Sequence, residues 1–328
     1  MNFKELFQSF ATIKIAVIGD VMLDTYWWGS VNRISPEAPV PVVALQKNEV
    51  RLGGAANVAL NLVALNANTS VISVIGDDAE SKTLKTLLAQ ENINTNYLLH
   101  SSSRITTNKT RILSRNQQMM RLDAEITTDL DFDTENNLLQ KIEQYIVNEK
   151  PQVIIFEDYN KGVLTQNIIT KTISLCKQHN VITTVDPKRK NFFNYVGVDI
   201  FKPNLIEVKE GLNILLDEIN INTLSSIHQQ LKEKLQHQIS FITLSEKGVF
   251  YNNENEQKII PTHIRNIADV SGAGDTVISV ASLVYATTNN MHLAAEMANI
   301  AGGLVCEEVG TAAINKDKLL SECERLIK

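Results

Sequence analysis

Short, almost wholly apolar segments separated by helical patterns are the feature that most restricts the fold of this chain. Apolar side chains at nearly every position are expected for strands covered on both faces of a parallel sheet. Between these segments, apolar residues recur at helical spacing, as in Ala55, Ala59 and Leu62. This alternation predicts an α/β fold with a mostly parallel sheet and right-handed crossovers. The predicted strands are residues 13–18, 71–75, 153–156, 181–185 and 239–244.

Two stretches interrupt this alternation, at approximately residues 25–45 and 106–123. The first carries Trp27 and Trp28 ahead of several prolines, and the second alternates polar and apolar residues about a turn near residues 115–116, which is typical of a hairpin. Both are predicted to pair into a small β-sheet that acts as a lid and excludes water. An exposed apolar face on this lid would favour a homodimer. We expect residues 1–328 to form a single domain.

Composition narrows the class of protein. Of the 328 residues, 44% are hydrophobic and 21% are charged, which is typical of globular domains. The formal net charge of −6 does not indicate nucleic acid or an anionic membrane as a partner. No apolar run is long enough to span a bilayer, and no signal peptide is recognised, so a cytoplasmic location is expected. Three scattered cysteines predict neither a disulfide framework nor a zinc site.

The string Gly272-Ala273-Gly274-Asp275 joins a glycine-rich turn to the start of a helical pattern. Such a turn presents free backbone N–H groups and the positive end of a helix dipole, which together bind phosphate. A carboxylate there would repel the ligand unless it took a proton from a hydroxyl that attacks phosphorus. The string therefore predicts ATP-dependent phosphorylation of an alcohol. The alternative is an ordinary turn whose Asp caps the helix.

Polar residues near the predicted strand ends suit a sugar. Asp24 follows the first strand, where ligands of open α/β sheets gather, and its carboxylate would accept two hydroxyl hydrogens. Gly53 and Gly54 allow close approach of a ligand to the backbone, and Asn57 offers both a donor and an acceptor. Each also has a purely structural explanation, as a loop-capping Asp or a tightly packed helix start.

Asn204 and Glu207 lie three residues apart, on one face of a helical turn. Hard oxygen ligands near phosphate suit Mg²⁺, reached through water, although Glu207 equally fits a capping box. Thr243, Ser245 and Gly248 end a predicted strand in a polar turn that would hold ATP.

Four basic residues are candidates for binding a phosphate that is already on the substrate, because Arg and Lys side chains suit that anion. Any of them could instead be a solvated surface charge. They are Arg111, Arg115, Arg121 and Lys161.

Two glycine-rich strings together resemble the signatures of the ribokinase-type (PfkB) carbohydrate kinase family. Longer strings are similar to the bacterial heptose 7-phosphate kinases of lipopolysaccharide synthesis, and the resemblance covers residues 15–311. Glu157 departs from this pattern, because those kinases have Ser there. The family signatures are GGAAN at 53–57 and DVSGAGD at 269–275, and the longer strings are GDVMLD at 19–24, RISPEAPVPV at 33–42, KTRILSRNQQ at 109–118 and DYNKG at 158–162.

The resemblance implies a ribokinase-like three-layer α/β/α domain with a β-lid. It also implies phosphorylation of D-glycero-β-D-manno-heptose 7-phosphate at O1 by ATP and Mg²⁺, in ADP-heptose synthesis. No nucleotidyltransferase motif is found, so a separate protein is expected to act next. The implied roles are base for Asp275; anion hole for Gly272, Ala273 and Gly274; sugar binding for Asp24, Gly53, Gly54 and Asn57; substrate binding for Arg111, Asp158 and Lys161; Mg²⁺ and phosphate for Asn204 and Glu207; ATP for Thr243, Ser245, Gly248 and Asn299; and a monovalent cation such as K⁺ for Asp269 and Gly310.

Other functions remain open at this point. A ribokinase-type kinase for fructose 6-phosphate or tagatose 6-phosphate would share these strings, and so would an inactive homologue that binds sugar or nucleotide. A Rossmann dehydrogenase is disfavoured, because the first strand is followed by Gly19-Asp20-Val21-Met22 and not by a Gly-x-Gly-x-x-Gly turn.

Overall fold

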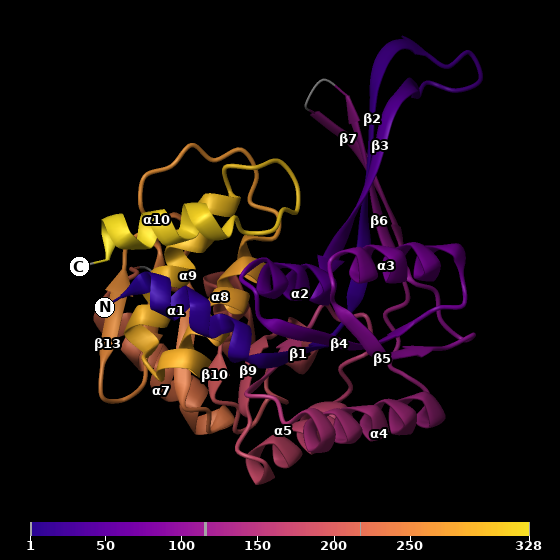
Figure 1. The fold of residues 1–328 in the computed structure, drawn as a ribbon. Helices are drawn as coiled ribbons and strands as arrows, with labels where there is room; N and C mark the ends of the chain where they lie inside the picture. The colour runs from indigo at the N-terminus through magenta and orange to yellow at the C-terminus, as the bar shows by residue number, and fades with distance from the viewer. Residues whose placement is uncertain (1, 115–116, 217, 328) are drawn as a thin grey trace.

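A large twisted sheet organises the chain in the computed structural model, which describes residues 2–114, 117–216 and 218–327 (Figure 1). Its strands run parallel from β5 to β11, and β12 and β13 add an antiparallel edge. In spatial order the strands are β13 (Gln257–Ile260), β12 (Val249–Asn252), β11 (Ile239–Thr243), β10 (Ile200–Phe201), β9 (Ile182–Asp186), β8 (Val153–Glu157), β1 (Lys14–Gly19), β4 (Asn68–Ile75) and β5 (Asn94–His100).

Helices cover both faces of this sheet, so the predicted three-layer α/β/α fold is confirmed. Alternate residues of each central strand feed two separate cores, as Val17 and Ile155 do on one face and Ile18 and Phe156 do on the other. On the first face lie α1 (Phe3–Ser9), α2 (Ala55–Ala64), α3 (Ala79–Gln90), α8 (Ala273–Thr288), α9 (Met291–Val305) and α10 (Lys316–Leu326). On the second lie α4 (Phe132–Glu149), α5 (Gln166–Gln178), α6 (Leu205–Leu212) and α7 (Ile221–Leu235).

Every strand predicted for the main sheet is present, although β4 begins at Asn68 and not at residue 71. The sequence reasoning missed β5, β12 and β13. These strands lie at or next to the edges of the sheet, where one side meets solvent, and β5 and β13 carry polar residues at many positions. An edge strand therefore lacks the continuous apolar run that marks a central one.

The predicted lid is a second sheet, with strand order β3, β2, β6, β7, and it projects away from the body in Figure 1. Its strands are β2 (Val21–Ile34), β3 (Pro41–Gly54), β6 (Thr107–Ser114) and β7 (Gln117–Ala124). The predicted bounds of 25–45 were too narrow, because β2 and β3 pair from Val21 and Gly54 outward. The hairpin turn predicted near residues 115–116, including Arg115, lies outside the described residues.

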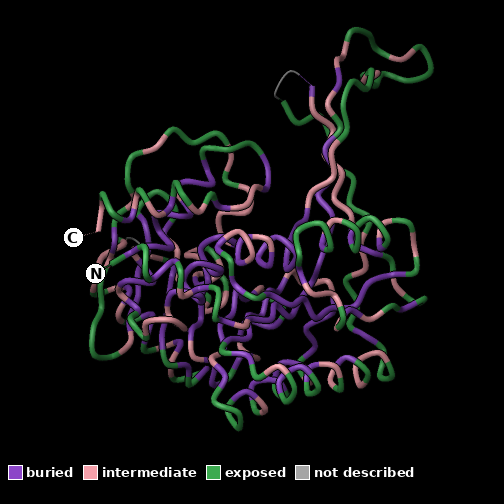
Figure 2. Tube along the Cα trace, in the orientation of Figure 1, coloured by how far each residue is buried: buried purple, intermediate pink, exposed green. Residues whose placement is uncertain are grey.

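The two faces of the lid differ in chemistry. Tyr26 aligns with Arg111, and Asp24 with Lys109, which makes one face polar. Trp27, by contrast, aligns with Ile112, and the neighbouring Met120 and Leu122 complete an apolar face. Trp27 is 39% exposed, Met120 is 55% exposed and Leu122 is 48% exposed. Figure 2 shows the lid as buried or half-buried near the body and exposed at its tip. An exposed apolar face of the kind that would favour a homodimer is therefore present.

A buried pair of histidines makes the stability of the second core depend on pH. His228 of α7 and His237 both contact the hydroxyl of Ser240, at 2.9 and 2.6 Å, and both are fully buried. Their other ring nitrogens have no hydrogen-bond partner among the described residues. Burial lowers the pKa of His237 to about 3, and it also lowers the pKa of His228.

We predict that the His237→Gln variant loses less stability on acidification than the native chain. The unfolded chain binds a proton at His237 near pH 6.5 and the folded chain does not, so stability falls as the pH drops from 6.5 toward 3. For His237 this loss is about 2 kcal/mol at pH 5. Urea denaturation at pH 7.5 and pH 5 measures it. The exposed His179→Gln variant is the control, and an equal acid loss in all three proteins would contradict the prediction.

Candidate active site

The proposed catalytic machinery gathers at the carboxyl ends of the central strands, beside the start of α8. This helix begins after Gly272, whose φ of +79° is a conformation that favours glycine. A Cβ atom on Gly272 would also approach the amide nitrogen of Asn57 to 2.8 Å. Among the described residues neither Gly272 nor Gly274 donates its backbone N–H, whereas Ala273 donates its own to Val270. The turn therefore retains two of its three predicted anion-binding amides.

Asp275 lies in the first turn of α8 and is 3% exposed. Two donors from distant parts of the chain hold its carboxylate. The side-chain amide of Asn57 in α2 donates to Oδ2 at 2.7 Å, and the hydroxyl of Tyr159 donates to Oδ1 at 2.8 Å. Burial raises the pKa of Asp275 to about 6, and the two hydrogen bonds oppose that rise. The carboxylate is thus mostly ionised at neutral pH and able to accept a proton.

Beneath the turn that precedes α8 lies an ion-pair network that the sequence reasoning missed. Asp186, the last residue of β9, accepts from Lys202 at 2.8 Å and from Lys188 at 3.1 Å. Lys202 is 2% exposed. A Cβ atom on Gly274 would lie 3.8 Å from the Lys202 nitrogen, so the network faces the turn directly. Burial opposes ionisation of Asp186, but the two lysines outweigh it and hold its pKa below the usual range.

Glu157, at the end of β8, aligns with Asp186 across the sheet and is fully buried. Neither of its carboxylate oxygens has a hydrogen-bond partner among the described residues. Burial, together with Asp186 and Asp275, raises its pKa well above the usual range. Burial and the two neighbouring carboxylates therefore favour the protonated form of Glu157.

Asn204 and Glu207 form the capping box of α6. Asn204 accepts from the Glu207 N–H at 2.9 Å, and Glu207 accepts from the Asn204 N–H at 2.7 Å. The second oxygen of Glu207 binds Lys188 at 2.6 Å. The structural alternative for this pair is therefore present, and Lys188 links it to Asp186 and so to the turn before α8.

The residues predicted to hold ATP lie at the end of β11, in the turn after it and in α9. Thr243 ends β11 and bridges to Asn204, which places it beside α6. Gly248 has a φ of +95°, and its missing side chain makes room for the carbonyl of Ile260. Ser245 also has a positive φ and accepts from Gly248. Asn299 of α9 donates to the Pro261 carbonyl at 2.8 Å.

The predicted sugar-binding residues lie at the base of the lid. Asp24 forms an ion pair with Arg111, so the carboxylate assigned to the sugar and the cation assigned to its phosphate already bind each other. A Cβ atom on Gly53 would meet Asp24 at 2.3 Å, whereas Gly54 permits a positive φ before α2. Lys161 binds Glu125 at 2.8 Å.

Asp158 differs from the other predicted sugar ligands, because its contacts are internal. It is 1% exposed, and its carboxylate accepts from Tyr195 at 2.7 Å, from Asn191 at 3.0 Å and from the backbone of Asn160 at 2.8 Å. These bonds fix the loop that follows β8, on which Tyr159 lies.

Asp269 and Gly310, predicted to hold a monovalent cation, contact each other. Asp269 accepts from the Gly310 N–H at 2.9 Å and from the N–H and hydroxyl of Ser271 at 3.0 and 2.9 Å. Among the described residues, no group of three or more His, Cys, Asp or Glu side chains is arranged to hold a metal ion.

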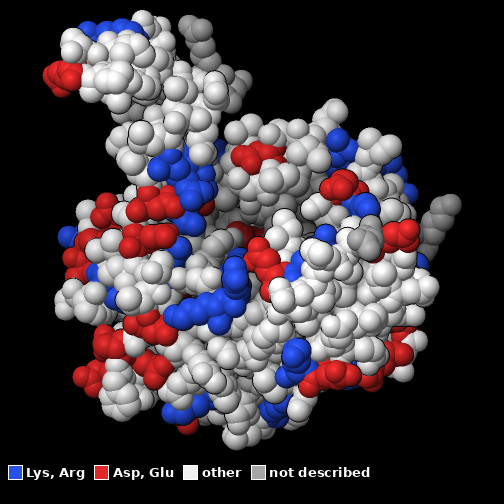
Figure 3. Space-filling view, turned by 180° about the vertical axis from the view of Figure 1, so that it is seen from behind, with Lys and Arg blue, Asp and Glu red and all other residues white. Residues whose placement is uncertain are grey.

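Figure 3 shows basic side chains gathered at the base of the lid and again across the middle of the body, with acidic side chains beside them.

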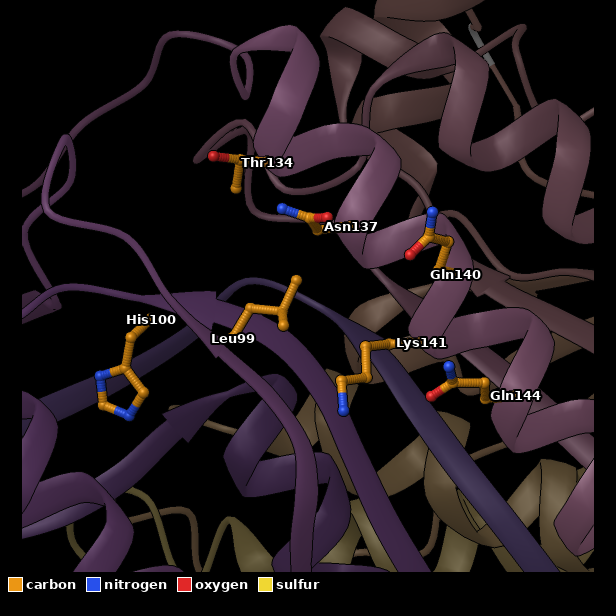
Figure 4. A pocket seen from close by; sticks show the side chains of 7 residues that line it. All are labelled: Leu99, His100, Thr134, Asn137, Gln140, Lys141 and Gln144. Carbon is orange, nitrogen blue, oxygen red and sulfur yellow. The ribbon is translucent and has the colours of Figure 1, made fainter.

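A separate pocket of about 180 Å³ lies between the end of β5 and α4, and Figure 4 shows that polar side chains such as Asn137 and Gln140 line much of it. It contains no residue that the sequence analysis singled out. None of the described helices has both the length and the apolar character needed to cross a membrane.

The model of the pfkB family carbohydrate kinases matches residues 12–318, and the chain belongs to this family.

Curated relatives include the bifunctional protein HldE of Helicobacter pylori strain G27, 39% identical over 93% of this chain, and that of Aliarcobacter butzleri, 41% identical over 93%. The chain spans 65% and 63% of the lengths of these two relatives. Among solved structures, phosphofructokinase-2 from Escherichia coli in complex with potassium has a TM-score of 0.80 at 17% identity, over 95% of this chain and 100% of that one. Ribokinase from Arabidopsis thaliana with ribose and ATP has a TM-score of 0.73 at 15% identity, over 94% and 98%.

Proposed function

We propose that this chain transfers the γ-phosphoryl group of ATP to O1 of D-glycero-β-D-manno-heptose 7-phosphate. The product would be the 1,7-bisphosphate, a precursor of ADP-heptose for the lipopolysaccharide core. Similarity to the HldE relatives over 93% of the chain supports the choice of sugar, as do the strings that resemble heptose 7-phosphate kinases. We infer that residues 1–328 act as one kinase domain in the cytoplasm, where ATP and sugar phosphates are found.

The position of Asp275 is the observation that carries the proposed chemistry. Its carboxylate lies in the same turn as the N–H groups of Gly272 and Gly274, which donate to none of the described residues. A hydroxyl bound at Asp275 would therefore face a phosphoryl group bound at that turn. Asp275 would take the hydroxyl proton, which its pKa of about 6 allows at neutral pH. Gly272 and Gly274 would donate to the transferred group.

Lys202 and Lys188 would stabilise the charge that develops on the phosphoryl oxygens. Lys202 lies beneath Gly274 and pairs with Asp186, so it is fixed before the substrate arrives. A buried ammonium group that is already in position stabilises this developing charge more strongly than a solvent-exposed one that must first move into place. ATP itself would lie along Thr243, Ser245, Gly248 and Asn299.

The proposed divalent cation is Mg²⁺, near Asn204 and Glu207. Both of these side chains already have partners in the capping box and at Lys188, so they would hold the ion through water. Oxygen donors of this kind suit hydrated Mg²⁺, which when bound would neutralise charge on the ATP phosphates. A monovalent cation beside Asp269 and Gly310 stays a prediction.

The polar face of the lid would bind the sugar and its 7-phosphate. Asp24 would accept sugar hydroxyls together with Asn57, while Gly53 and Gly54 let the sugar approach the backbone. Arg111, Lys109 and Lys161 would face the phosphate, which is a dianion that suits a cluster of cations. Burial and the neighbouring Lys161 both lower the pKa of Lys109, as expected for a cation that awaits an anionic ligand.

We predict that Asp275→Asn lowers kcat by at least a hundredfold with little change in the KM for ATP. The amide keeps the shape of the side chain but accepts no proton, so only the chemical step should suffer. Steady-state kinetics with a coupled ADP assay measure both constants. Near-native turnover in the variant would contradict the assignment of Asp275 as the base.

We predict that heptose 7-phosphate and Mg-ATP give a new anomeric phosphate signal in ³¹P NMR. Transfer to O1 places a phosphate on the anomeric carbon, and its signal splits differently from that of a phosphate on a primary alcohol. Parallel samples contain fructose 6-phosphate and tagatose 6-phosphate. Faster turnover of either hexose phosphate would favour that substrate, and no turnover of any sugar would favour an inactive homologue.

We propose a homodimer that buries the apolar face of the lid, formed by Trp27, Ile112, Met120 and Leu122. The native chain should then sediment at twice 36.6 kDa. Leu122→Lys places a charge on this face and should give the monomer. The control is Val147→Lys, at an exposed apolar residue of α4, which should leave the dimer intact. A native monomer, or a dimer that tolerates Leu122→Lys, would contradict this interface.

A further inference from the structure

We infer that Tyr159 is the positioning residue of the catalytic base, fixing the carboxylate of Asp275 through its hydroxyl and linking that base to the lid. This inference rests on the proposed role of Asp275. The pattern that carries it is a chain of contacts, from Asp20 to the loop after β8, from that loop to Asp275, and from the same loop to the lid.

The first step is the anchoring of the loop. Asp20 follows β1 and is buried. Its carboxylate accepts hydrogen bonds from the backbone N–H groups of every second residue in part of the loop after β8. The bonds run from Tyr159 at 2.8 Å, Lys161 at 3.0 Å and Val163 at 3.1 Å. Three donors on one buried carboxylate fix the backbone of this loop, and so the Cα position of Tyr159.

The second step is the contact with the base. The Tyr159 hydroxyl donates to Oδ1 of Asp275 at 2.8 Å while Asn57 holds Oδ2. With one donor on each oxygen, the plane of the carboxylate is fixed. No other described residue donates to Oδ1, so its second lone pair would accept from a substrate hydroxyl. Burial and the Asp275 charge raise the pKa of Tyr159 well above its usual range, so the phenol keeps its proton and acts only as a donor here.

The third step connects the ring to the lid and to the phosphate network. The ammonium groups of Lys109 in β6 and Lys188 both lie 5.6 Å from the centre of the Tyr159 ring. Cations at this distance are attracted to the face of an aromatic ring. Tyr159 thus contacts the lid, the base and the Asp186–Lys188 network, and any lid movement that shifts Lys109 acts on the ring that orients the base.

Charged groups from several elements surround Asp275. Together they contribute to the pKa that a pH measurement of this residue would report. Asp186 and Lys188 face it from β9 and the segment after it, and Glu157 faces it from β8. Lys202 is linked to Asp275 indirectly, because it forms an ion pair with Asp186. The Tyr159→Phe substitution removes none of these groups. It also keeps Asp20, whose pKa is raised to about 6 by burial and by Asp158.

The test compares Tyr159→Phe with the native chain and with Tyr251→Phe, which removes a buried hydroxyl that has no partner among the described residues. Loss of a hydrogen bond to the ionised carboxylate should move the acidic limb of kcat/KM upward by about one pH unit. The expected loss of kcat/KM is therefore about tenfold at pH 8.5 and roughly fiftyfold at pH 6, with the KM for ATP unchanged.

A second readout does not depend on the substrate. In protein labelled with ¹³C at the Asp carboxyl carbons, the Asp275 signal is identified by its loss in Asp275→Asn. It should titrate near pH 6 in the native chain and in Tyr251→Phe, and near pH 7 in Tyr159→Phe. An unmoved Asp275 titration in Tyr159→Phe overturns the inference. If heptose 7-phosphate is not phosphorylated but the titration moves, the proposed substrate fails and the role of Tyr159 stands.

Discussion

The carboxylate of Asp275 is the point on which the rest of the site depends, because three elements meet there. The residue itself comes from the start of α8, Asn57 comes from the start of α2, and Tyr159 comes from the loop after β8. A buried carboxylate with its donors already in place loses little entropy when a substrate arrives. Burial also raises the pKa of Asp275, and the two donors limit that rise. The same pair of hydrogen bonds therefore determines both the strength and the orientation of the proposed base.

The sequence was most informative where chemistry is local. Gly272, Gly274 and Asp275 lie within one helical turn, so the amides and the carboxylate could be placed together before any fold was known. The central strands could be predicted for a similar reason, because burial on both faces leaves a continuous apolar run. The lid was recognised from its alternation, although its inner ends, at Val21 and Gly54, were not.

Long-range partners escaped prediction. Tyr159 contacts Asp275 across 116 positions of the chain, and nothing near either residue signals the contact. The same holds for Asp186 and Lys202, which the sheet brings together from two different strand ends. Glu157 was the exception, because the sequence already showed that it departs from the pattern of the heptose kinases. Asn204 and Glu207 show the opposite case, in which a local motif supports two explanations and the capping box is the one whose hydrogen bonds are present.

The register of the lid has a consequence for how this protein could vary. Because successive side chains of a strand point to opposite sides, one extra residue inserted between Val21 and Asp24 would turn Asp24 and Tyr26 outward and Trp27 inward. Charged groups would then leave the polar face of the lid, and an indole would enter it. Beyond the irregularity between Trp28 and Gly29 the pairing is already offset, so length changes there would leave the inner part untouched. Natural variation in lid length should therefore be concentrated at the tip and rare at the root.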